Sequence, residues 1–568
     1  MVARIPLDLA VQMILNDEEP IKGFDSESDM SDEEDPDCPS GTLRPSTTQP
    51  PHPPDEHLLS DMEESSDEAS EEEEEIDRPI ISNRMSRKGS YWAETPPRQG
   101  RTPIHNIVRS RPGPAPGLTT VSPIDAWKLF ITDNIIEEVL MCTNLEGRRV
   151  AESRGKTWKK VSKDELLAFI GLIILAGSEK NWDVATRELF GSPLHNPMYK
   201  ATMSIGRFED IRRFLRFDDK RTRATRLEAD HLAAFRYIWD LFLVNCRQRY
   251  NPSDCVTVDE QLVPFRGRTK FLQYMKSKPA KYGIKIFWVC DADTPYAIDG
   301  MVYTGKQPGE GVSKNLGFNV VSQLCSGFRN TGRNVTTDNF FTSVPLAEHL
   351  LEKGLTIVGT LHQNKPDIPP VMKASKAREL FSTEFGFNGS MTMVNYVAKK
   401  EKVVVLLSTM HYNKAVDENT QKKKPEVITF YNQTKGGVDV VDQIVGTYTC
   451  KRQTQRWPMT LWYNMIDVAT LNAYTFFKAQ HPEFYSGIIQ RSAALSYRAL
   501  TGACEALHEK SAGMCPKPTN LHHCSNGKVW GDKSCHPATG GQESKEEEVQ
   551  DVPKKPRPQS QAMLLEMQ

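Results

Sequence analysis

The sequence predicts a mixed α/β fold in which a strand-rich block lies between two helical regions. Residues 123 to about 250 repeat apolar side chains at the i, i+3, i+4 and i+7 spacing of amphipathic helices. After Asn251 and Pro252 the pattern changes to short runs of β-branched and aromatic residues alternating with helical stretches, which is typical of an α/β layout. Helical spacing returns from about residue 436.

Residues 1–120 are expected to be disordered, because acidic Ser-rich runs, a Pro-rich spacer and an Arg/Pro stretch bury too little apolar surface to offset chain entropy. Between Asp17 and Asp77, 24 acidic residues stand against two basic ones, a local charge of −22. Since the formal net charge of the chain is −3, the remaining residues sum to +19. An excess of basic residues outside this acidic stretch suits a nucleic-acid partner, and a solvated charged surface is the alternative interpretation.

The first helical region contains four strongly periodic stretches, at residues 125–146, 162–177, 204–217 and 231–250. Ser162 and Glu165 have the spacing of a capping box, which predicts a helix start at that point. The longest apolar run of the chain ends at Gly177 and has about 13 residues, short of the ~20 needed to cross a bilayer. We therefore expect a buried helix there and no membrane partner.

The strand-rich block starts with the run DCVTVDEQLVPF. Further strands are predicted at residues 282–292, 296–305, 333–338 and 355–361, with helices at 313–328 and 344–354. A second, Lys-rich strand tract covers residues 385–411 and closes with the run 427–433 after a polar loop. Helices follow at 436–448 and 459–484, and the chain after about residue 510 is expected to be mostly disordered.

Eleven cysteines are spread over the chain, an odd number that does not suit a disulfide framework. We expect reduced thiols and an intracellular protein, because the apolar N-terminal segment is interrupted by Asp8 and is not followed by a small-residue cleavage site.

Four carboxylates have the placement of a possible metal site. Asp259 and Asp338 each follow a β-branched run, and Asp439 and Asp442 lie three residues apart in a predicted helix, so they share one face. Oxygen ligands of this kind bind hard divalent cations, and two such ions stabilise the attacking and leaving oxygens of a phosphoryl displacement. The alternative is structural, since Asp is common as a cap at the ends of strands and helices.

Several longer motifs make the case more specific. The stretches TVDEQLVPFRGR, KPAKYGIKI, NVTTDNFFTS, TIVGT, YNQTKGGVDVVDQ and RWPM resemble the piggyBac family of DNA transposases and the proteins derived from them, in the family's order, over residues 123 to 500. The resemblance implies a ribonuclease H-like catalytic core in which Asp259, Asp338 and Asp439 bind metal. It also implies that Asp442 is an additional essential carboxylate.

The resemblance implies a divided layout, with a β-rich insertion in the core and a helical dimerisation and DNA-binding domain split around it. The expected segments are the disordered region 1–120, helical part 121–253, core part 254–364, insertion 365–426, core part 427–450, helical part 451–510 and a disordered tail 511–568.

The implied reaction is metal-dependent cleavage of double-stranded DNA at terminal repeats, hairpin formation by the freed 3′-hydroxyl, and joining to TTAA target DNA. A homodimer using Mg²⁺ or Mn²⁺ is expected. Candidate phosphate contacts are basic residues near the acids, and Trp457 is a candidate for stacking on an unpaired base, with a core position as its alternative. The basic candidates are Arg266, Arg268, Lys278, Lys281, Lys285, Lys365, Lys451 and Arg452.

Two features depart from the pattern of active family members. The C-terminal cysteines are about ten residues apart instead of forming paired CxxC motifs, so no zinc site is expected even with nearby histidines. The residues concerned are Cys504, Cys515, Cys524, Cys535, His522, His523 and His536. His362 stands where active members commonly place an arginine, and histidine lacks the fork-shaped guanidinium that binds phosphate.

Three functions stay open at this point: a transposase, a domesticated DNA-binding or chromatin-associated protein that keeps the fold without activity, and a metal-dependent nuclease without strand transfer. A nuclear location is expected, since the inferred substrate is chromosomal DNA and the basic run at residues 553–558 resembles an import signal. The Arg-rich stretch between Arg98 and Arg111 could substitute for it.

Overall fold

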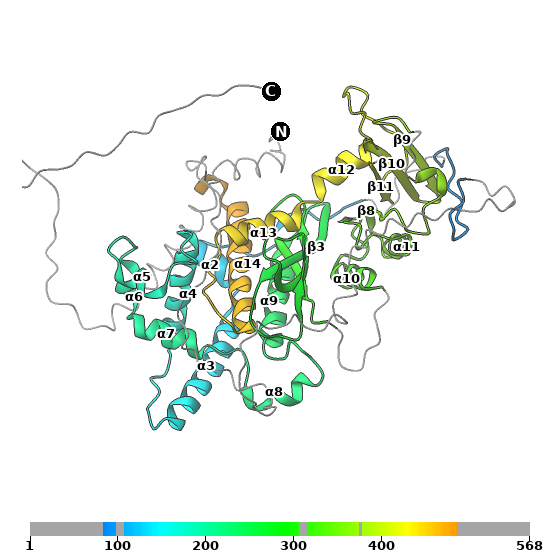
Figure 1. Ribbon diagram of the computed structural model, residues 1–568. Helices are drawn as coiled ribbons and strands as arrows, with labels where there is room; N and C mark the ends of the chain where they lie inside the picture. The colour runs from blue at the N-terminus through cyan, green and yellow to red at the C-terminus, as the bar shows by residue number, and fades with distance from the viewer. Residues whose placement is uncertain (1–82, 98–106, 306–314, 374–377, 401, 486–568) are drawn as a thin grey trace, which may run out of the picture. The chain divides into compact units, whose positions relative to one another are not determined.

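The structure, a computed structural model, describes residues 83–97, 107–305, 315–373, 378–400 and 402–485. Figure 1 shows the labelled elements in chain order. The predictions of disorder for residues 1–82 and 511–568, and those on the C-terminal cysteines and histidines, concern residues outside this part of the chain.

The predicted helical region forms eight helices. They are α2 (Pro123–Lys128), α3 (Asp133–Ser153), α4 (Lys163–Ser178), α5 (Thr186–Gly191), α6 (Met198–Thr202), α7 (Ile205–Phe214), α8 (Lys220–Leu227) and α9 (Arg236–Arg249). The predicted capping box at α4 is confirmed, because the Ser162 hydroxyl accepts from the Glu165 N–H and the Glu165 carboxylate accepts from the Ser162 N–H. Helix α4 is buried from Leu166 to Ser178, as the apolar run predicts.

A nine-stranded sheet follows the helices. Its strands are β3 (Cys255–Pro264), β4 (Leu272–Tyr274), β5 (Tyr282–Asp291), β6 (Ala297–Val302), β7 (Asn334–Thr337), β8 (Thr356–Thr360), β9 (Thr383–Asn388), β10 (Met391–Lys399) and β11 (Lys402–Ser408). The order is β4-β5-β3-β7-β8-β11-β10-β9, and β6 also pairs with β5. Strands β3, β7 and β8 are parallel to one another, whereas the other pairings are antiparallel.

Two helices connect the parallel strands of this sheet. Helix α10 (Leu316–Leu324) precedes β7, and α11 (Val344–Glu352) lies between β7 and β8. Both helices and five of the six strands from β3 to β8 were predicted from the sequence pattern, and the short strand β4 was not.

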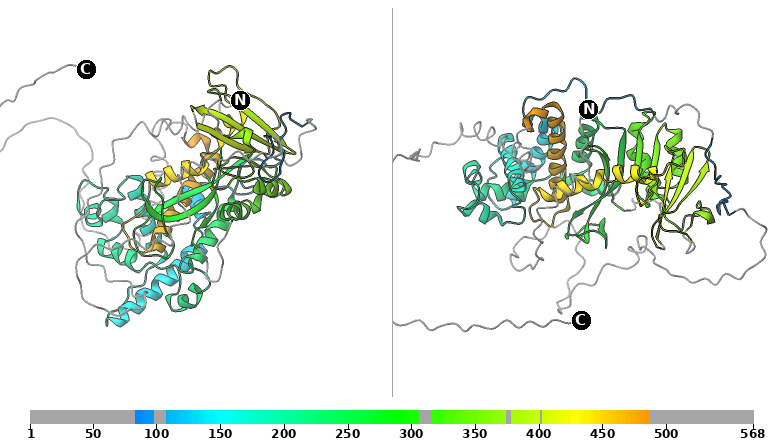
Figure 2. Two further views of the ribbon diagram at one scale, coloured as in Figure 1. Left: turned by 45° about the vertical axis from the view of Figure 1, so that its right-hand side comes forward. Right: turned by 90° about the horizontal axis from the view of Figure 1, so that it is seen from above.

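The strands of the predicted β-rich insertion continue the central sheet. Strand β11 pairs with β8, for example Leu407 with Gly359, so β11, β10 and β9 extend the central sheet (Figure 2). This part has its own smaller apolar cluster, built on Phe385, Tyr396 and Leu406.

The run 427–433, predicted as the end of the strand tract, is helical instead. It forms most of α12 (Glu426–Thr434). Its β-branched residues favour a strand locally, but Val427 and Ile428 are buried against the smaller apolar cluster, and this tertiary packing decides the conformation.

Two further helices close the described chain, α13 (Gly437–Thr447) and α14 (Trp457–Gln480). Helix α14 packs against α2 and α9, although more than 200 residues separate α14 from either of them. In addition, a Cβ on Gly177 of α4 would lie 2.5 Å from the Tyr448 carbonyl oxygen. The helices before and after the sheet therefore pack into one body.

Part of the region that we expect to be disordered is folded. Residues 83–97 lie along β9, where the Ala93 N–H donates to the Phe387 carbonyl at 2.8 Å and the Phe387 N–H donates back at 2.8 Å. The Trp92 side chain is fully buried, which the average composition of the region does not reveal. Residues 107–120 are described as well, and Gly113–Pro114 (β1) pairs with Tyr250–Asn251 (β2).

None of the described helices is both long enough and apolar enough to span a membrane. The six cysteines among the described residues are free thiols, and five of them are buried.

Candidate active site

The strand register brings two of the predicted carboxylates together. Strand β3 pairs with β7 up to Val258 opposite Thr337, so the next residue on each strand is an aspartate, Asp259 and Asp338. Neighbouring strands are ~4.8 Å apart, and equivalent positions on parallel strands point to the same face. The two carboxylates, 79 positions apart in sequence, therefore leave the sheet side by side.

A close helix approach adds the third carboxylate. Gly437 begins α13 directly over β3, where a Cβ would lie 2.7 Å from Thr257 Oγ1 and 2.9 Å from the Asp291 carbonyl oxygen. Only glycine fits at this distance, which explains one glycine of the sequence KGGVD. Asp439 is then in the first turn of α13, on the same side of the helix as Asp442.

The end of α12 fixes the same junction. The Thr257 hydroxyl donates to the Thr434 carbonyl at 2.6 Å, and the Thr336 hydroxyl donates to Thr434 Oγ1 at 2.9 Å. Because Thr257 is on β3 and Thr336 on β7, the turn between α12 and α13 is held over the two strands that carry Asp259 and Asp338.

The charges of Asp338 and Asp439 act on Asp259, which is consistent with three neighbouring acids. Burial, then the charges of Glu260, Asp338 and Asp439, raise the pKa of Asp259 to about 8. Burial and the Glu260 charge raise the pKa of Asp338 to about 6, against backbone N–H donors that lower it. Both pKa shifts are caused first by burial and then by neighbouring negative charge.

A tyrosine on α12 is close enough to the same three acids for their charges to act on its pKa. Burial raises the pKa of Tyr431 to about 12, and the charges of Asp338, Asp259 and Asp439 act in the same direction. Asp442 lies slightly apart: burial raises its pKa, a hydrogen bond from Gln261 and the charge of Lys278 lower it, and Asp439 raises it.

The donor set suits a hard cation, because carboxylate oxygens are the ligands that Mg²⁺ and Mn²⁺ prefer. The Asp259 carboxylate accepts a bond from the N–H of Glu260, and burial and crowding disfavour its charged form, an arrangement that a bound cation would relieve. In the described part of the chain, however, no three His, Cys, Asp or Glu side chains are close enough to hold an ion as they stand.

Two charged residues at the site were missed or misjudged from the sequence. Glu260 follows Asp259 directly and contributes to the pKa shifts of both aspartates. Lys285 was expected to contact DNA, but it is 1% exposed, and its ammonium lies 4.0 Å from Glu260 Oε2, close to the faces of Phe287 and Phe340. The doublet of acids in TVDEQ is the only sequence signal for Glu260.

Four of the basic DNA-contact candidates lie at or near the surface. Arg266 and Arg268 are exposed after β3, and the Arg266 guanidinium lies 5.8 Å from the ring centroid of Tyr282. Lys281 is exposed, and the ammonium of Lys278 donates to the Glu260 carbonyl at 3.2 Å, next to the acid cluster.

The other candidates have partners within the chain. Arg452 is buried and donates to the carbonyls of Asn181, at 2.8 Å, and Val184, and Lys451 donates to the Pro264 carbonyl at 2.9 Å. Trp457 is half-buried and packs edge-on against Phe271, with ring centroids 5.1 Å apart. In this conformation the Arg452 side chain is not available to a phosphate.

The remaining candidate, Lys365, is half-buried, and burial lowers its pKa, against the charge of Asp367. His362 is exposed and lines an open cavity of about 420 Å³ together with Asn339, the neighbour of Asp338. The position that departs from the family pattern thus lies next to the acid cluster.

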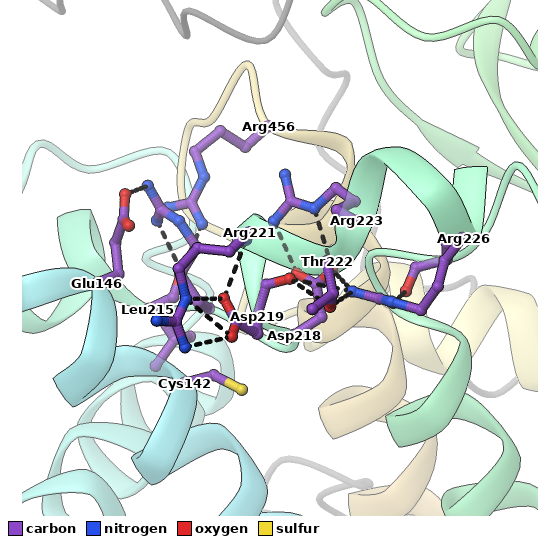
Figure 3. Close-up of polar contacts among 12 residues, drawn as sticks. Cys142, Glu146, Leu215, Asp218, Asp219, Arg221, Thr222, Arg223, Arg226 and Arg456 are labelled. Carbon is purple, nitrogen blue, oxygen red and sulfur yellow. Dashed lines mark hydrogen bonds and ion pairs between the residues drawn. The ribbon is translucent and has the colours of Figure 1, made fainter. Parts of the chain in front are cut away.

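The motif RWPM has a structural role that sequence reasoning did not assign. Arg456 donates to the carbonyls of Arg213, at 3.1 Å, and Leu215, which ties the start of α14 to the end of α7. Figure 3 shows this contact beside the arginines of α8, where Asp218 accepts from Arg223 and Arg226. The motif therefore joins the two helical parts of the chain.

The comparisons with known proteins agree with this architecture. Residues 122–474 match the family model described as "Transposase IS4". The piggyBac transposase, in a cryo-EM structure of its synaptic complex with hairpin DNA, is 38% identical, with a TM-score of 0.67, over 72% of this chain and 86% of that one. The chain therefore belongs to the piggyBac family of transposases.

Human relatives carry names that point to transposable elements. PiggyBac transposable element-derived protein 3 of Homo sapiens is 25% identical over 378 residues, which are 63% of this chain and 61% of that protein. PiggyBac transposable element-derived protein 2 of Homo sapiens is 23% identical over 385 residues, 62% of this chain and 61% of that protein. The chain thus spans about 61% of the length of these curated relatives.

Proposed function

We propose that the chain is a DNA transposase that cleaves transposon ends, forms DNA hairpins and joins the excised element to TTAA sites. The observation that carries this proposal is the placement of Asp259, Asp338 and Asp439, on β3, after β7 and on α13, close enough for the charges of Asp338 and Asp439 to raise the pKa of Asp259. A protein that only binds DNA needs basic residues, whereas three crowded acids raise the cost of the folded state.

The residues of the chain have distinct parts in this proposal. Divalent cations bound by the acids would activate water or a 3′-hydroxyl and neutralise charge on the departing oxygen. Glu260 and Lys285 lie behind the acids and keep a buried positive charge close to them. Arg266, Arg268 and Lys281 are exposed and can bind the phosphates that flank the reacting one.

Incubation of the full chain with Mg²⁺ or Mn²⁺ and labelled DNA that carries the terminal repeats tests the proposal. On a denaturing gel we expect a nicked strand first and then a hairpin of nearly twice the length. Joining to a TTAA-containing plasmid would follow. Products without a hairpin would point to a plain nuclease, the third hypothesis. Absence of any product, with the DNA bound, would favour a domesticated protein.

The strand order supports a ribonuclease H-like core. Strands β6, β5 and β3 are antiparallel neighbours, and β3, β7 and β8 are parallel neighbours with α11 between the last two. We also propose that the helices on either side of the sheet form one dimerisation and DNA-binding domain, because α14 packs on α2 and Arg456 bonds to the end of α7.

A domesticated DNA-binding protein is the second candidate. It is favoured by His362 in place of a guanidinium and by the finding that no three described acids could hold an ion as placed. The flanking genomic DNA separates the two candidates cheaply, since intact terminal repeats around the gene support an active element.

We further propose that the chain acts as a homodimer in the nucleus. Replacement of Lys554, Lys555 and Arg557 by alanine should reduce nuclear accumulation of a tagged chain. Further changes at Arg98, Arg101, Arg109 and Arg111 should remove most of the remainder. Exclusively cytoplasmic wild-type protein would contradict both the location and the transposase proposal.

A further inference from the structure

We propose that Gln261 is a positioning residue that holds the carboxylate of Asp442 beside the acid cluster. Gln261 lies on β3, two residues after Asp259, and is 2% exposed. Its side-chain Nε2 donates to Asp442 Oδ1 at 2.8 Å. The inference rests on the proposed function, in which Asp442 is one of the essential acids.

The orientation of the Gln261 amide follows from its other partners. Trp288 Nε1 donates to Gln261 Oε1 at 2.9 Å, and Asn464 Nδ2 donates to the same oxygen at 3.1 Å. Because an indole N–H can only donate, the amide oxygen must face Trp288. The amide NH₂ must then face Asp442, whose ionised carboxylate can only accept. A flipped amide would set donor against donor at Trp288 and acceptor against acceptor at Asp442.

The two residues that donate to the Gln261 amide oxygen are held in the core. The Trp288 side chain is fully buried on β5, and a Cβ on Gly300 of β6 would lie 2.6 Å from its ring, so the indole has no room to turn. Asn464 is buried on α14. With Asp442 on α13, one amide links β3, β5, α13 and α14.

The hydrogen bonds around Gln261 fix the donor that faces Asp442. Trp288 and Asn464 both donate to Oε1 of Gln261, and Nε2 of Gln261 donates to the carboxylate of Asp442, on which the charge of Asp439 acts. Outer partners of this kind fix the orientation of an acid without touching the substrate, and their loss usually costs about 10–100-fold in metal affinity or activity. The alternative is that the bond only joins α13 to the sheet.

A double-mutant cycle separates the two roles. Mn²⁺ binding to the full chain is measured by calorimetry for wild type, Gln261→Met, Asp442→Asn and the double variant. We expect Gln261→Met to weaken binding about 10–100-fold and to add no further loss once Asp442 is replaced. Equal losses in both backgrounds would show a merely structural role and overturn the inference.

A matched control is available on β4. Gln273 is half-buried, and its amide donates to the Leu272 carbonyl at 3.2 Å, so Gln273→Met makes the same chemical change away from Asp442 and should leave Mn²⁺ binding unchanged. Wild-type affinity in Gln261→Met would overturn the inference and leave the proposed function intact. Absence of Mn²⁺ binding by the wild type would overturn the proposed metal site and this inference with it.

A second variant protects the test against misfolding. If Gln261→Met loses its cooperative thermal transition, Gln261→Glu decides instead. The glutamate has the same shape and still accepts from Trp288 and Asn464, but it turns a carboxyl oxygen towards Asp442 Oδ1. We expect at least the same loss of Mn²⁺ affinity, and wild-type affinity in this variant would overturn the inference.

Discussion

The two halves of the nine-stranded sheet are hydrogen-bonded to each other but differ in how they are built. The half from β6 to β8 carries Asp259 and Asp338 and is assembled from segments distant in sequence. The half from β11 to β9 is a meander of consecutive strands with short turns, and its outer strand is paired with Ala93 of the N-terminal segment. The candidate acids thus lie in one half of the sheet, and the N-terminal segment is anchored to the other half.

This difference predicts which mutations should alter reactivity and which should alter stability. In the first half, the acids are crowded with like charge and α12 and α13 are held over them by tight contacts, so changes there should alter reactivity or helix docking. The second half has the smaller apolar cluster on one face, whereas the buried Trp92 belongs to the main core cluster. Four experiments can break or sharpen this separation.

The largest effect is expected at the acids. Asp259→Asn and Asp338→Asn should each reduce DNA cleavage by at least about 10²–10³-fold, because the lost charge stabilises the transition state. The thermal transition should stay cooperative, since the asparagine has the same shape. The comparison with Asp293→Asn, an exposed acid after β5, controls for charge alone. Cleavage at the wild-type rate by either acid variant would remove that residue from the site.

A large stability effect is expected from the N-terminal segment. Trp92 is fully buried and lies against Gly386 of β9, so Trp92→Ala should cost about 3–5 kcal/mol locally. Hydrogen exchange should accelerate in β9 and β10 and change little in β3 and β7. Tyr91→Ala, at a neighbouring residue that is 52% exposed, should leave exchange unchanged. Equal acceleration in both halves would show that the sheet unfolds as one unit.

Sequence patterns predicted most elements but not their contacts. The capping box at Ser162 is local, and so is the alternation that marks β10 and β11, so both could be predicted. The pairing of Val258 with Thr337 is not local. The residue pattern offered Asp259 and Asp338 as a possible metal site with a structural alternative, and the family resemblance then favoured the site. Gln261 carries no signal of its own, because its partners come from β5, α13 and α14.

The misses have physical causes. Strand propensity in the run 427–433 is outweighed by burial of one helix face against the insertion. Average composition hides the single Trp92 that anchors residues 83–97. Lys285 looks like any other lysine of a basic stretch until the sheet places it behind Glu260.

A moderate effect is expected where α13 approaches the sheet. Gly437→Ala would place a methyl group 2.7 Å from Thr257 Oγ1, so α13 must shift, and the free energy of unfolding should fall by about 1–3 kcal/mol. Gly446→Ala is the matched control on the same helix, because a Cβ there meets no atom within 4 Å. It should be neutral or stabilise by up to about 1 kcal/mol. Denaturant unfolding that gives equal values for both would contradict the close approach.

The smallest effect is expected from pH. The pKa of Asp259 is raised to about 8 and that of Asp338 to about 6, from an ordinary value of 3.8, so the folded chain holds protons that the unfolded chain releases. Their contribution to stability is complete below pH ~4 and is lost as the pH rises through 6 and then 8.

Asp259→Asn removes the crowded charge, so at pH 8 without metal it should melt a few degrees above the wild type, and at pH 4 the two should agree more closely. Mg²⁺ should stabilise the wild type at pH 8 and narrow this gap. If metal-free Asp259→Asn melts below the wild type at pH 8, the charges of the acids do not destabilise the first half of the sheet, and the contrast between the two halves is wrong.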